Sequence, residues 1–293
     1  LMSSYPSGTI VLALQNDGVI IWALLSNIDI KKFVKEEKIK RTDIIIGGPP
    51  CQGFSIAGKR IIDDERNTLY KSFLSFVKEL KPKVFLMENV PNIMSMGKGI
   101  VKDAILKDFR AIGYNVSTKI LLASDYGVPQ NRKRAFFIGI LGSKTFDFPE
   151  PIDKDKVNTK DAISDLPDID LEDGVEYPLP PESSFQKMIR NGNEYLFNHQ
   201  LTNHKPKTVE IISLVPDGGN YKDLPKDLQG TRKVNIAWTR LNSLKPSFTI
   251  DTGHRHHFHY KYNRVPTVRE SARIQSFPDD FIFWHYEKMY GSI

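Results

Sequence analysis

The sequence predicts an α/β fold, with a doubly wound, mostly parallel sheet and a second, smaller, loop-rich domain. In the first half of the chain, short apolar runs that end in turn residues alternate with stretches of helical period. This alternation is typical of parallel α/β sheets. After about Phe148 the chain becomes rich in Pro, Asp, Gly, Asn and Lys and loses its period, which returns only at 262–283.

The first half contains the elements on which this prediction rests. In chain order we expect a strand at 43–46, a helix at 67–80, a strand at 84–87, a helix at 101–112, and strands at about 116–122 and 135–140. In such sheets ligands bind beyond the carboxyl ends of the strands. The loops after Ile46 and Met87 should therefore share one edge, which brings Cys51 and Glu88 to that edge.

The shift in composition divides the chain into three stretches. We expect a first domain at 1–148, a smaller domain at 149–258, and a C-terminal segment at 259–293 that returns to the first domain. A helix is expected at 267–276, where periodicity is restored.

Charge and cysteine content narrow the class of protein. Lys and Arg exceed Asp and Glu by 41 − 35 = 6, and the isoelectric point is about 9.1, which favours a polyanionic partner. The single cysteine excludes an intramolecular disulfide and argues against a cysteine-based zinc site. No apolar run reaches 18 residues, so no membrane span is expected. The N-terminus lacks signal-peptide features, and the expected location is the cytoplasm.

Cys51 lies in an unusual setting for a cysteine of the core. Pro49-Pro50 stiffens the backbone before it, and Gly47-Gly48 and Gly53 allow sharp turns on both sides. A thiol presented in this way is a candidate nucleophile. The alternative is a small, buried cysteine in a tight turn, the commoner state of a free thiol.

Two further groups could act with that thiol. Glu88 follows a strand directly, so it could hydrogen-bond a substrate ring nitrogen, or it could be a solvated strand-end residue. Arg132 and Arg134 alternate at the start of a strand and could both point at a phosphate. The alternative for this basic run is a solvated face.

Four blocks in this order resemble the signatures of cytosine-C5 DNA methyltransferases: GGPPCQGFS, MENVP, YGVPQNRKRAFFIG and RVPTVRESARIQSFPDDF. The resemblance covers about 40–140 and 262–283, and the stretch between them is where this family keeps its target-recognition domain. It implies the fold of S-adenosylmethionine-dependent methyltransferases. It also implies a restriction-modification setting, with double-stranded DNA as partner and a cognate endonuclease acting on the same site.

The resemblance assigns roles to the candidate residues. Cys51 would add to C6 of a cytosine flipped out of the duplex, and Glu88 would hydrogen-bond N3 and the exocyclic amine. Arg134, assisted by Arg132, would hold the flipped base or its phosphate, while Asn89 would orient the loop. The loop at 52–67 would close over the DNA.

The implied methyl donor is S-adenosylmethionine, and no metal is expected. Asp29, Pro50 and Leu69 match positions that line the cofactor pocket in relatives. The chain departs from the family at its glycine-rich first block, where only Gly8 remains, and at its C-terminus, where the GNxVPP block is missing.

These departures leave several interpretations open. Segments of the protein could be missing from this chain, a complementary subunit could supply them, or the protein could bind DNA without catalysis. An RNA cytosine-C5 methyltransferase is a further alternative, because that branch keeps the same nucleophile block.

The middle segment, about 150–255, should read DNA bases, mainly from loops in the major groove. The alternative is that most of its polar residues contact phosphate or water. The candidates are Asn198, His199, Asn203, His204, Lys205, Lys207, Arg232, Lys233, Thr239 and Arg240. The histidines between His254 and His259 have a spacing that zinc could use, but a strand facing DNA is the favoured interpretation. Arg269, Glu270 and Arg273 are expected to form structural ion pairs that tie the two domains together.

Overall fold

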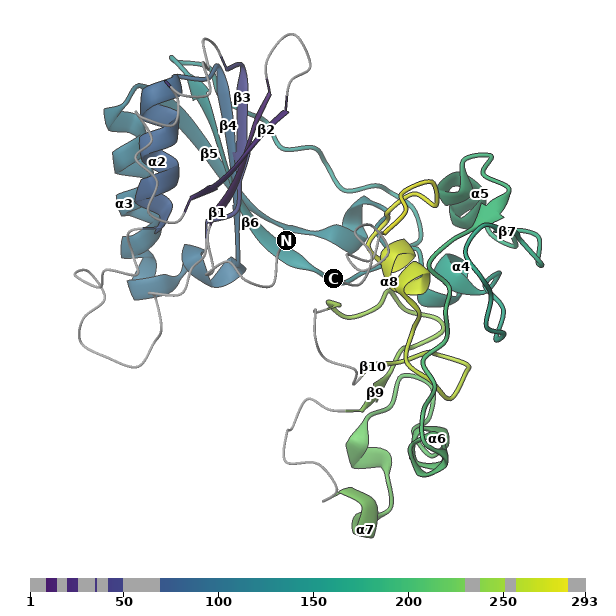
Figure 1. The fold of residues 1–293 in the computed structure, drawn as a ribbon. Coiled ribbons are helices and arrows are strands. Elements are labelled where there is room, and N and C mark those ends of the chain that lie inside the picture. The colour runs from purple at the N-terminus through teal and green to yellow at the C-terminus, as the bar shows by residue number, and fades with distance from the viewer. Residues whose placement is uncertain are drawn as a thin grey trace, which may run out of the picture. The chain divides into compact units, whose positions relative to one another are not determined.

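The computed structural model describes residues 9–14, 20–25, 35, 42–49, 69–229, 238–250 and 257–283. The chain divides into two compact units (Figure 1). The first unit holds residues 1–121 and 133–150, and the second holds 122–132 and 151–293. Among the described residues, no helix combines the length and apolar character that crossing a bilayer requires.

A six-stranded sheet forms the centre of the first unit. Its spatial order is β2-β1-β3-β4-β6-β5. In chain order the strands are β1 (Thr9–Leu14), β2 (Ile20–Leu25), β3 (Ile44–Gly47), β4 (Val84–Asn89), β5 (Tyr114–Leu122) and β6 (Lys133–Leu141). The expected strands at 43–46, 84–87, 116–122 and 135–140 are thus confirmed, with small shifts at their ends.

The α/β fold class is confirmed, but the strand directions correct one part of the prediction. Strands β3 and β4 are parallel, whereas β1 pairs antiparallel with both β2 and β3, and β4 pairs antiparallel with β6. The sheet is therefore mixed rather than mostly parallel. Five residues join β1 to β2, and a connection of that length cannot make a parallel crossover.

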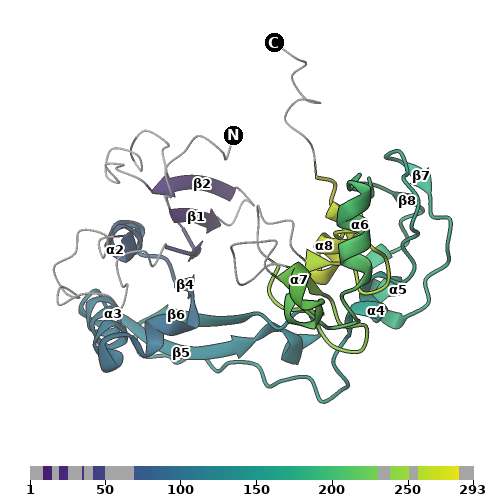
Figure 2. The same ribbon diagram turned by 90° about the horizontal axis from the view of Figure 1, so that it is seen from below.

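Helices α2 (Leu69–Leu80) and α3 (Ile100–Ala111) cover one face of this sheet (Figures 1 and 2). Both match the predicted helices to within two residues at each end. Their apolar stripes supply Phe73 and Phe109, which are fully buried against Phe85 of β4 and Tyr114 of β5. The rings of Phe85 and Phe109 stack with centroids 4.2 Å apart, so aromatic contacts join the helices to the sheet.

Short 3-10 helices connect these elements and occur in the second unit as well. They are η2 (Pro91–Met94), η3 (Met96–Gly99), η4 (Ala123–Tyr126) and η5 (Tyr221–Asp223). Gly97, Lys98 and Gly99 all have positive φ, which turns the chain sharply from η3 into α3.

The second unit consists of short elements and long loops, as its composition predicts. Its helices are α4 (Thr159–Ile163), α5 (Ser184–Arg190), α6 (Pro206–Ser213), α7 (Lys226–Gln229) and α8 (Val268–Ile274). Its strands form two pairs, β7 (Val175–Glu176) with β8 (Tyr195–Leu196), and β9 (Thr239–Arg240) with β10 (His257–Phe258). Helix α8 confirms the helix expected at 267–276, and a capping box between Thr267 and Glu270 fixes its start.

The domain boundaries of the sequence prediction differ from these units in two places. Residues 122–132 belong to the second unit, although they lie within the expected first domain. The described part of the C-terminal segment packs in the second unit, where Ile274 joins a core with Leu166 and Leu196. A return of 259–293 to the first domain stays a prediction.

Buried ion pairs replace part of the apolar core in the second unit. Arg273 is fully buried and donates to Asp165 and Asp279, and Arg264 donates to both carboxylate oxygens of Glu270 at 2.8 Å. The structural role expected for Arg269, Glu270 and Arg273 is confirmed. Their partners all lie within the second unit, so the expectation that these pairs tie two domains together is wrong.

Candidate active site

The carboxyl ends of β3 and β4 lie next to each other, as the sequence predicts. The two strands are parallel, with Gly47 opposite Met87. Gly48 and Pro49 therefore leave the sheet beside Glu88 and Asn89. A Cβ added at Gly48 would lie 3.3 Å from Oε2 of Glu88. Glycine at this position thus leaves room beside the carboxylate.

Asn89 ties the two strand ends together. Its side chain is buried, and Nδ2 donates a hydrogen bond of 2.8 Å to the carbonyl oxygen of Pro49. Its Oδ1 accepts a bond from the amide of Val90 at 2.9 Å. The side-chain amide thus bonds backbone groups on both sides, as donor and as acceptor. Pro49 stands two residues before Cys51 in the chain.

Glu88 and Arg134 form an ion pair at this edge. β4 and β6 run antiparallel with Glu88 opposite Phe136, which sets Arg134 two residues along on the neighbouring strand. Arg134 Nε lies 2.8 Å from Oε1 of Glu88, and its Nη1 donates to the carbonyl oxygen of Lys133. The side chain of Glu88 is 35% exposed and that of Arg134 is 21% exposed, so both groups are accessible to solvent.

Of the other predicted site residues, the structure describes only Arg132 and Leu69. Arg132 lies in the loop before β6, where its amide donates to the carbonyl of Gln130 and its carbonyl accepts from the amide of Ala123. Leu69 begins α2. Asp29, Pro50 and Cys51 lie outside the described residues, as does the predicted closing loop at 52–67.

Three of the residues expected to contact DNA have structural roles instead. Asn198, His199 and Arg240 are at most 8% exposed. The Arg240 guanidinium donates to the carbonyls of Val215, Ile212, His259 and Tyr262. Asn203, Lys205 and Lys207 are exposed, while Arg232 and Lys233 lie outside the described residues.

The histidine cluster is only partly described, and of its described members His257 lies in strand β10 and is half-buried. His259 is fully buried, and its Nδ1 accepts bonds from the amides of Lys261 and Tyr262, each at 3.0 Å. Burial lowers the pKa of His259 to about 4 despite the nearby carboxylate of Glu270. Among the described residues no group of three or more possible metal ligands occurs. His254, Arg255 and His256 lie outside these residues.

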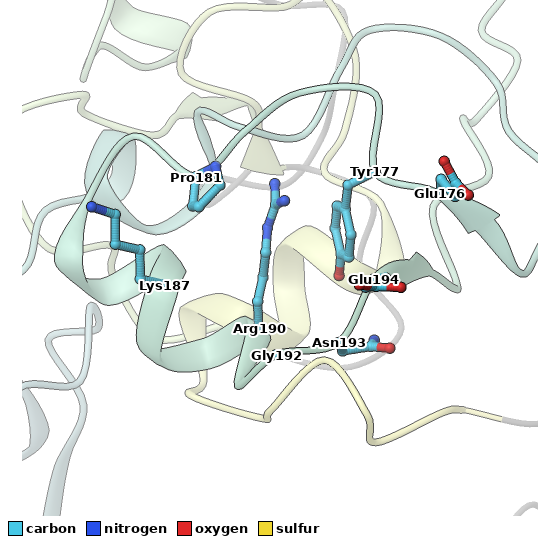
Figure 3. Close-up of a pocket in the computed structure, with 8 residues that line it drawn as sticks. All are labelled: Glu176, Tyr177, Pro181, Lys187, Arg190, Gly192, Asn193 and Glu194. Atoms are coloured by element: carbon cyan, nitrogen blue, oxygen red, sulfur yellow. The ribbon is translucent and has the colours of Figure 1, made fainter.

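A hollow of about 620 Å³ is lined by residues of α5, by Glu176 of β7 and by the chain on either side of α5 (Figure 3). Arg190 lies over the ring of Tyr177, 3.7 Å from its centroid, and also pairs with Asp165. The remaining charged lining residues are Lys187, Glu176 and Glu194. Two acidic and two basic side chains therefore line this hollow.

Sequence reasoning missed two features of the site. It assigned Glu88 and Arg134 separately to the substrate and did not anticipate their ion pair. It also overlooked the polar contacts that fix the chain just before β6, where Asn131 bonds to the segment 246–249. For the ion pair, the only sequence signal was a carboxylate at the end of one predicted strand and an arginine at the start of another. For the contact of Asn131 with 246–249 the sequence gave no signal, because more than a hundred residues separate the two segments.

Comparison with known proteins identifies the family. A family model described as C-5 cytosine-specific DNA methylase matches residues 19–290. Type II methyltransferase M1.HphI of Haemophilus parahaemolyticus is 37% identical over 88% of this chain and 64% of its own length. M.DdeI of Desulfomicrobium norvegicum is 38% identical over 84% of this chain and 65% of its own length. The chain thus spans slightly less than two thirds of these relatives.

A solved structure supports the same conclusion. It is described as a DNA modification methyltransferase encoded within a prophage (E. coli). This chain matches it with a TM-score of 0.65 and 30% identity, over 86% of this chain and 74% of that one. The shared fold, the ordered blocks and the family match lead to one assignment: the chain belongs to the C-5 cytosine-specific DNA methylase family.

Proposed function

We propose that the protein is a DNA (cytosine-5)-methyltransferase that acts through a covalent adduct of Cys51. One observation carries this proposal. The Glu88 carboxylate, oriented by Arg134, lies beside the strand end whose Pro49 carbonyl is fixed by Asn89, two residues before Cys51. A nucleophile and a carboxylate at one sheet edge suit a reaction that adds to one side of a ring and stabilises charge on another.

In this mechanism the Cys51 thiolate adds to C6 of the cytosine. Glu88 accepts a hydrogen bond from the exocyclic amine and donates a proton to N3 as the thiolate adds, which neutralises the negative charge that develops on the ring. The ring then carries an enamine whose C5 is nucleophilic. After C5 has gained the methyl group, a base removes the C5 proton and Cys51 is eliminated. Arg134 acts by holding Glu88 in line, and Arg132 assists at the base or its phosphate.

The target base must leave the duplex, because the ring faces of a stacked cytosine are inaccessible. Extrusion costs a few kcal/mol. Lys59, Arg60 and Arg66 belong to the loop proposed to close over the DNA, and their charge suits contact with phosphates. That loop follows the nucleophile directly in the chain.

The proposed methyl donor is S-adenosylmethionine, which supplies an electrophilic methyl group when bound. The described strand ends fit such a ligand, because adjacent parallel strands β3 and β4 end together and Gly48 carries no side chain into the space beside Glu88. Asp29, Pro50 and Leu69 are the residues proposed to line its pocket. Their role is to orient the donor toward the base and to keep water out.

The proposed substrate is double-stranded DNA, with a cognate restriction endonuclease acting on the same site. The names of the relatives, which are type II methyltransferases, support this setting. The alternative is that a complementary subunit supplies part of the cofactor pocket. Calorimetry of this chain alone with S-adenosylmethionine distinguishes a single-chain enzyme from an enzyme of two subunits, because only the first should bind the cofactor by itself.

The deciding experiment compares methyl transfer to duplex DNA and to transfer RNA, using the wild-type chain and Cys51→Ser. We expect labelled methyl groups in DNA for the wild type only, and a covalent complex on DNA containing 5-fluorocytosine only when Cys51 is present. DNA binding should survive the substitution. Methylation by Cys51→Ser would refute the mechanism, and labelling of transfer RNA alone would replace DNA with RNA as the substrate.

A further inference from the structure

The chain immediately before β6 is held by a segment more than a hundred residues later. The Ser247 amide donates to the carbonyl of Pro129 at 2.9 Å, and the Asn131 amide donates to the carbonyl of Ser247 at 2.6 Å. These bonds form an isolated parallel bridge between Gln130 and Ser247. We call this contact between 129–131 and 246–249 the strap.

The side chain of Asn131 links the strap to a third segment. Its Nδ2 donates to the carbonyl of Pro246 at 3.3 Å, and its Oδ1 accepts from the hydroxyl of Ser124 at 2.9 Å. Lys156 in turn donates to Ser124 and pairs with Asp125 at 2.7 Å. One side chain therefore connects η4, the turn before β6 and the later segment.

The later half of the strap is anchored in the core of the second unit. Phe248 and Ile250 pack against the cluster that contains Ile163 and Ile274. The residue before the strap, Lys245, accepts bonds through its carbonyl from both the amide and the hydroxyl of Thr159, each at 3.0 Å. The strap is thus a fixed part of the second unit.

Covalent continuity gives this anchor a consequence for the site. β6 begins at Lys133, two residues after Asn131, and its second residue is Arg134, the partner of Glu88. A shift at Asn131 displaces the start of β6 and with it the guanidinium. Displacements of about 1 Å at a reacting group can lower rates by about 100-fold.

We propose that Asn131 is a positioning residue, which through the strap fixes Arg134 and thereby the orientation of Glu88. The expected effect on the rate of methyl transfer rests on the proposed function, whereas the expected effect on the start of β6 does not.

The experiment compares Asn131→Ala with Asn115→Ala in the full chain. Asn115 is a matched control, since its Nδ2 also bonds a distant backbone carbonyl, that of Ser143, at 3.2 Å, and it lies far along the chain from the strap. Hydrogen–deuterium exchange reports the position of the strap without any need for activity. We expect faster exchange of the amides at 131–135 in Asn131→Ala and unchanged exchange there in Asn115→Ala.

Single-turnover methylation of duplex DNA then reports the kinetic consequence. We expect the rate to fall by about 10-fold in Asn131→Ala, with DNA affinity and melting temperature close to those of the wild type, and no change in Asn115→Ala. Unchanged exchange at 131–135 would overturn the inference. So would a wild-type rate, or a rate loss that merely follows loss of folded protein.

Failure of the two proposals can be told apart. If the wild type transfers no methyl group to DNA, the proposed function fails, while the exchange result still decides whether Asn131 fixes the start of β6. Ser247→Pro provides a second variant, because it removes the amide that donates to Pro129 and leaves the Asn131 side chain intact. It should reproduce the exchange change of Asn131→Ala, and normal protection in this variant would count against the strap.

Discussion

The ion pair between Glu88 and Arg134 matters for orientation more than for stability. Both side chains are partly exposed, and pairs of this kind contribute about 0–1 kcal/mol to folding. The pair instead limits the directions in which the carboxylate can point. A catalytic carboxylate gains most from such preorganisation, because no reorientation is then needed in the transition state.

Glu88→Gln should therefore lower turnover far more than it lowers DNA affinity. The amide keeps the size of the side chain but loses its charge and its proton chemistry, and general acid–base groups typically contribute about 100-fold or more. Steady-state methylation and DNA titration measure the two quantities. Glu79→Gln, an exposed glutamate on α2, is the control and should behave as the wild type. Equal losses of turnover and affinity in Glu88→Gln would indicate a structural role.

Arg134→Lys tests the orientation argument directly. Lysine keeps the charge but lacks the planar fork that places Nε 2.8 Å from Oε1 of Glu88. We expect kcat to fall by about 10-fold, while KM for DNA changes little. Lys83→Gln breaks the matched ion pair with Asp43, 2.8 Å long, at the start of β4, and should leave kcat unchanged. A wild-type kcat in Arg134→Lys would show that charge alone suffices.

The single residues show what sequence can and cannot predict about a site. Glu88 and Arg134 were predicted as site residues because fixed blocks carry them at the end of one strand and the start of another, and the structure brings them together in an ion pair. Arg240 was misjudged as a DNA contact because it is a basic residue of the middle segment, whereas its guanidinium bonds the carbonyls of Ile212, Val215, His259 and Tyr262. A basic residue can bond either phosphate or buried backbone, and only tertiary packing distinguishes the two.

At the scale of elements, β6 depends on close packing against β4. Gly139 lies opposite Phe85, and a Cβ added at Gly139 would lie 2.0 Å from Cε1 of that ring. Phe85 cannot easily move, because it stacks on Phe109 and meets Phe73 edge-on. Glycine at 139 is thus required by the aromatic layer between the sheet and its helices.

Gly139→Ala should destabilise the first unit by about 1–3 kcal/mol through overpacking. Thermal unfolding followed by circular dichroism measures the loss. Adding Phe85→Leu makes room for the new methyl group, so the double variant should lose less than the sum of the two single variants. Additive losses would show that the Gly139 methyl group and the Phe85 ring do not clash.

Hydrophobic periodicity predicts where a helix or strand lies better than it predicts which strand pairs with which. Helices α2 and α3 follow from apolar residues at helical spacing, and the strands from apolar runs between turns. Strand direction is a different matter, because it depends on the connection and on the neighbour. The sequence did not reveal that β1 and β2 form a hairpin beside β3, or that β6 runs against β4.

At the scale of the whole molecule, the two units are stabilised by different means. The described core of the first unit is apolar and aromatic, with Phe73, Phe76, Phe85, Phe109 and Phe137 almost fully buried. The second unit buries Arg269, Arg273, Glu270, Asp165 and His259 as well. Buried charges and a neutral buried histidine make stability depend on pH. Acid should therefore affect the second unit first.

His259 determines the pH at which the second unit begins to lose stability as acid is added. Burial lowers its pKa from 6.5 to about 4, so the unfolded chain takes up a proton between these values and the folded chain does not. Stability from this source is complete above pH 6.5 and is lost as pH falls toward 4, by about 3 kcal/mol in all. Glu270 extends the loss to lower pH, because Arg264 and His259 outweigh burial and lower its pKa as well.

The expected result is acid unfolding of the second unit at a pH where the first unit remains folded. Hydrogen–deuterium exchange between pH 7 and 4, corrected for the intrinsic rate, should show α8 losing protection before α3. His259→Asn tests the cause, because an asparagine Oδ1 can accept the bonds from Lys261 and Tyr262 but does not titrate. This variant should reduce the pH dependence of α8 protection, with the remainder due to His199, whose pKa burial also lowers. If α8 and α3 lost protection together, or if His259→Asn left the pH dependence unchanged, the acid sensitivity would not arise from these buried groups.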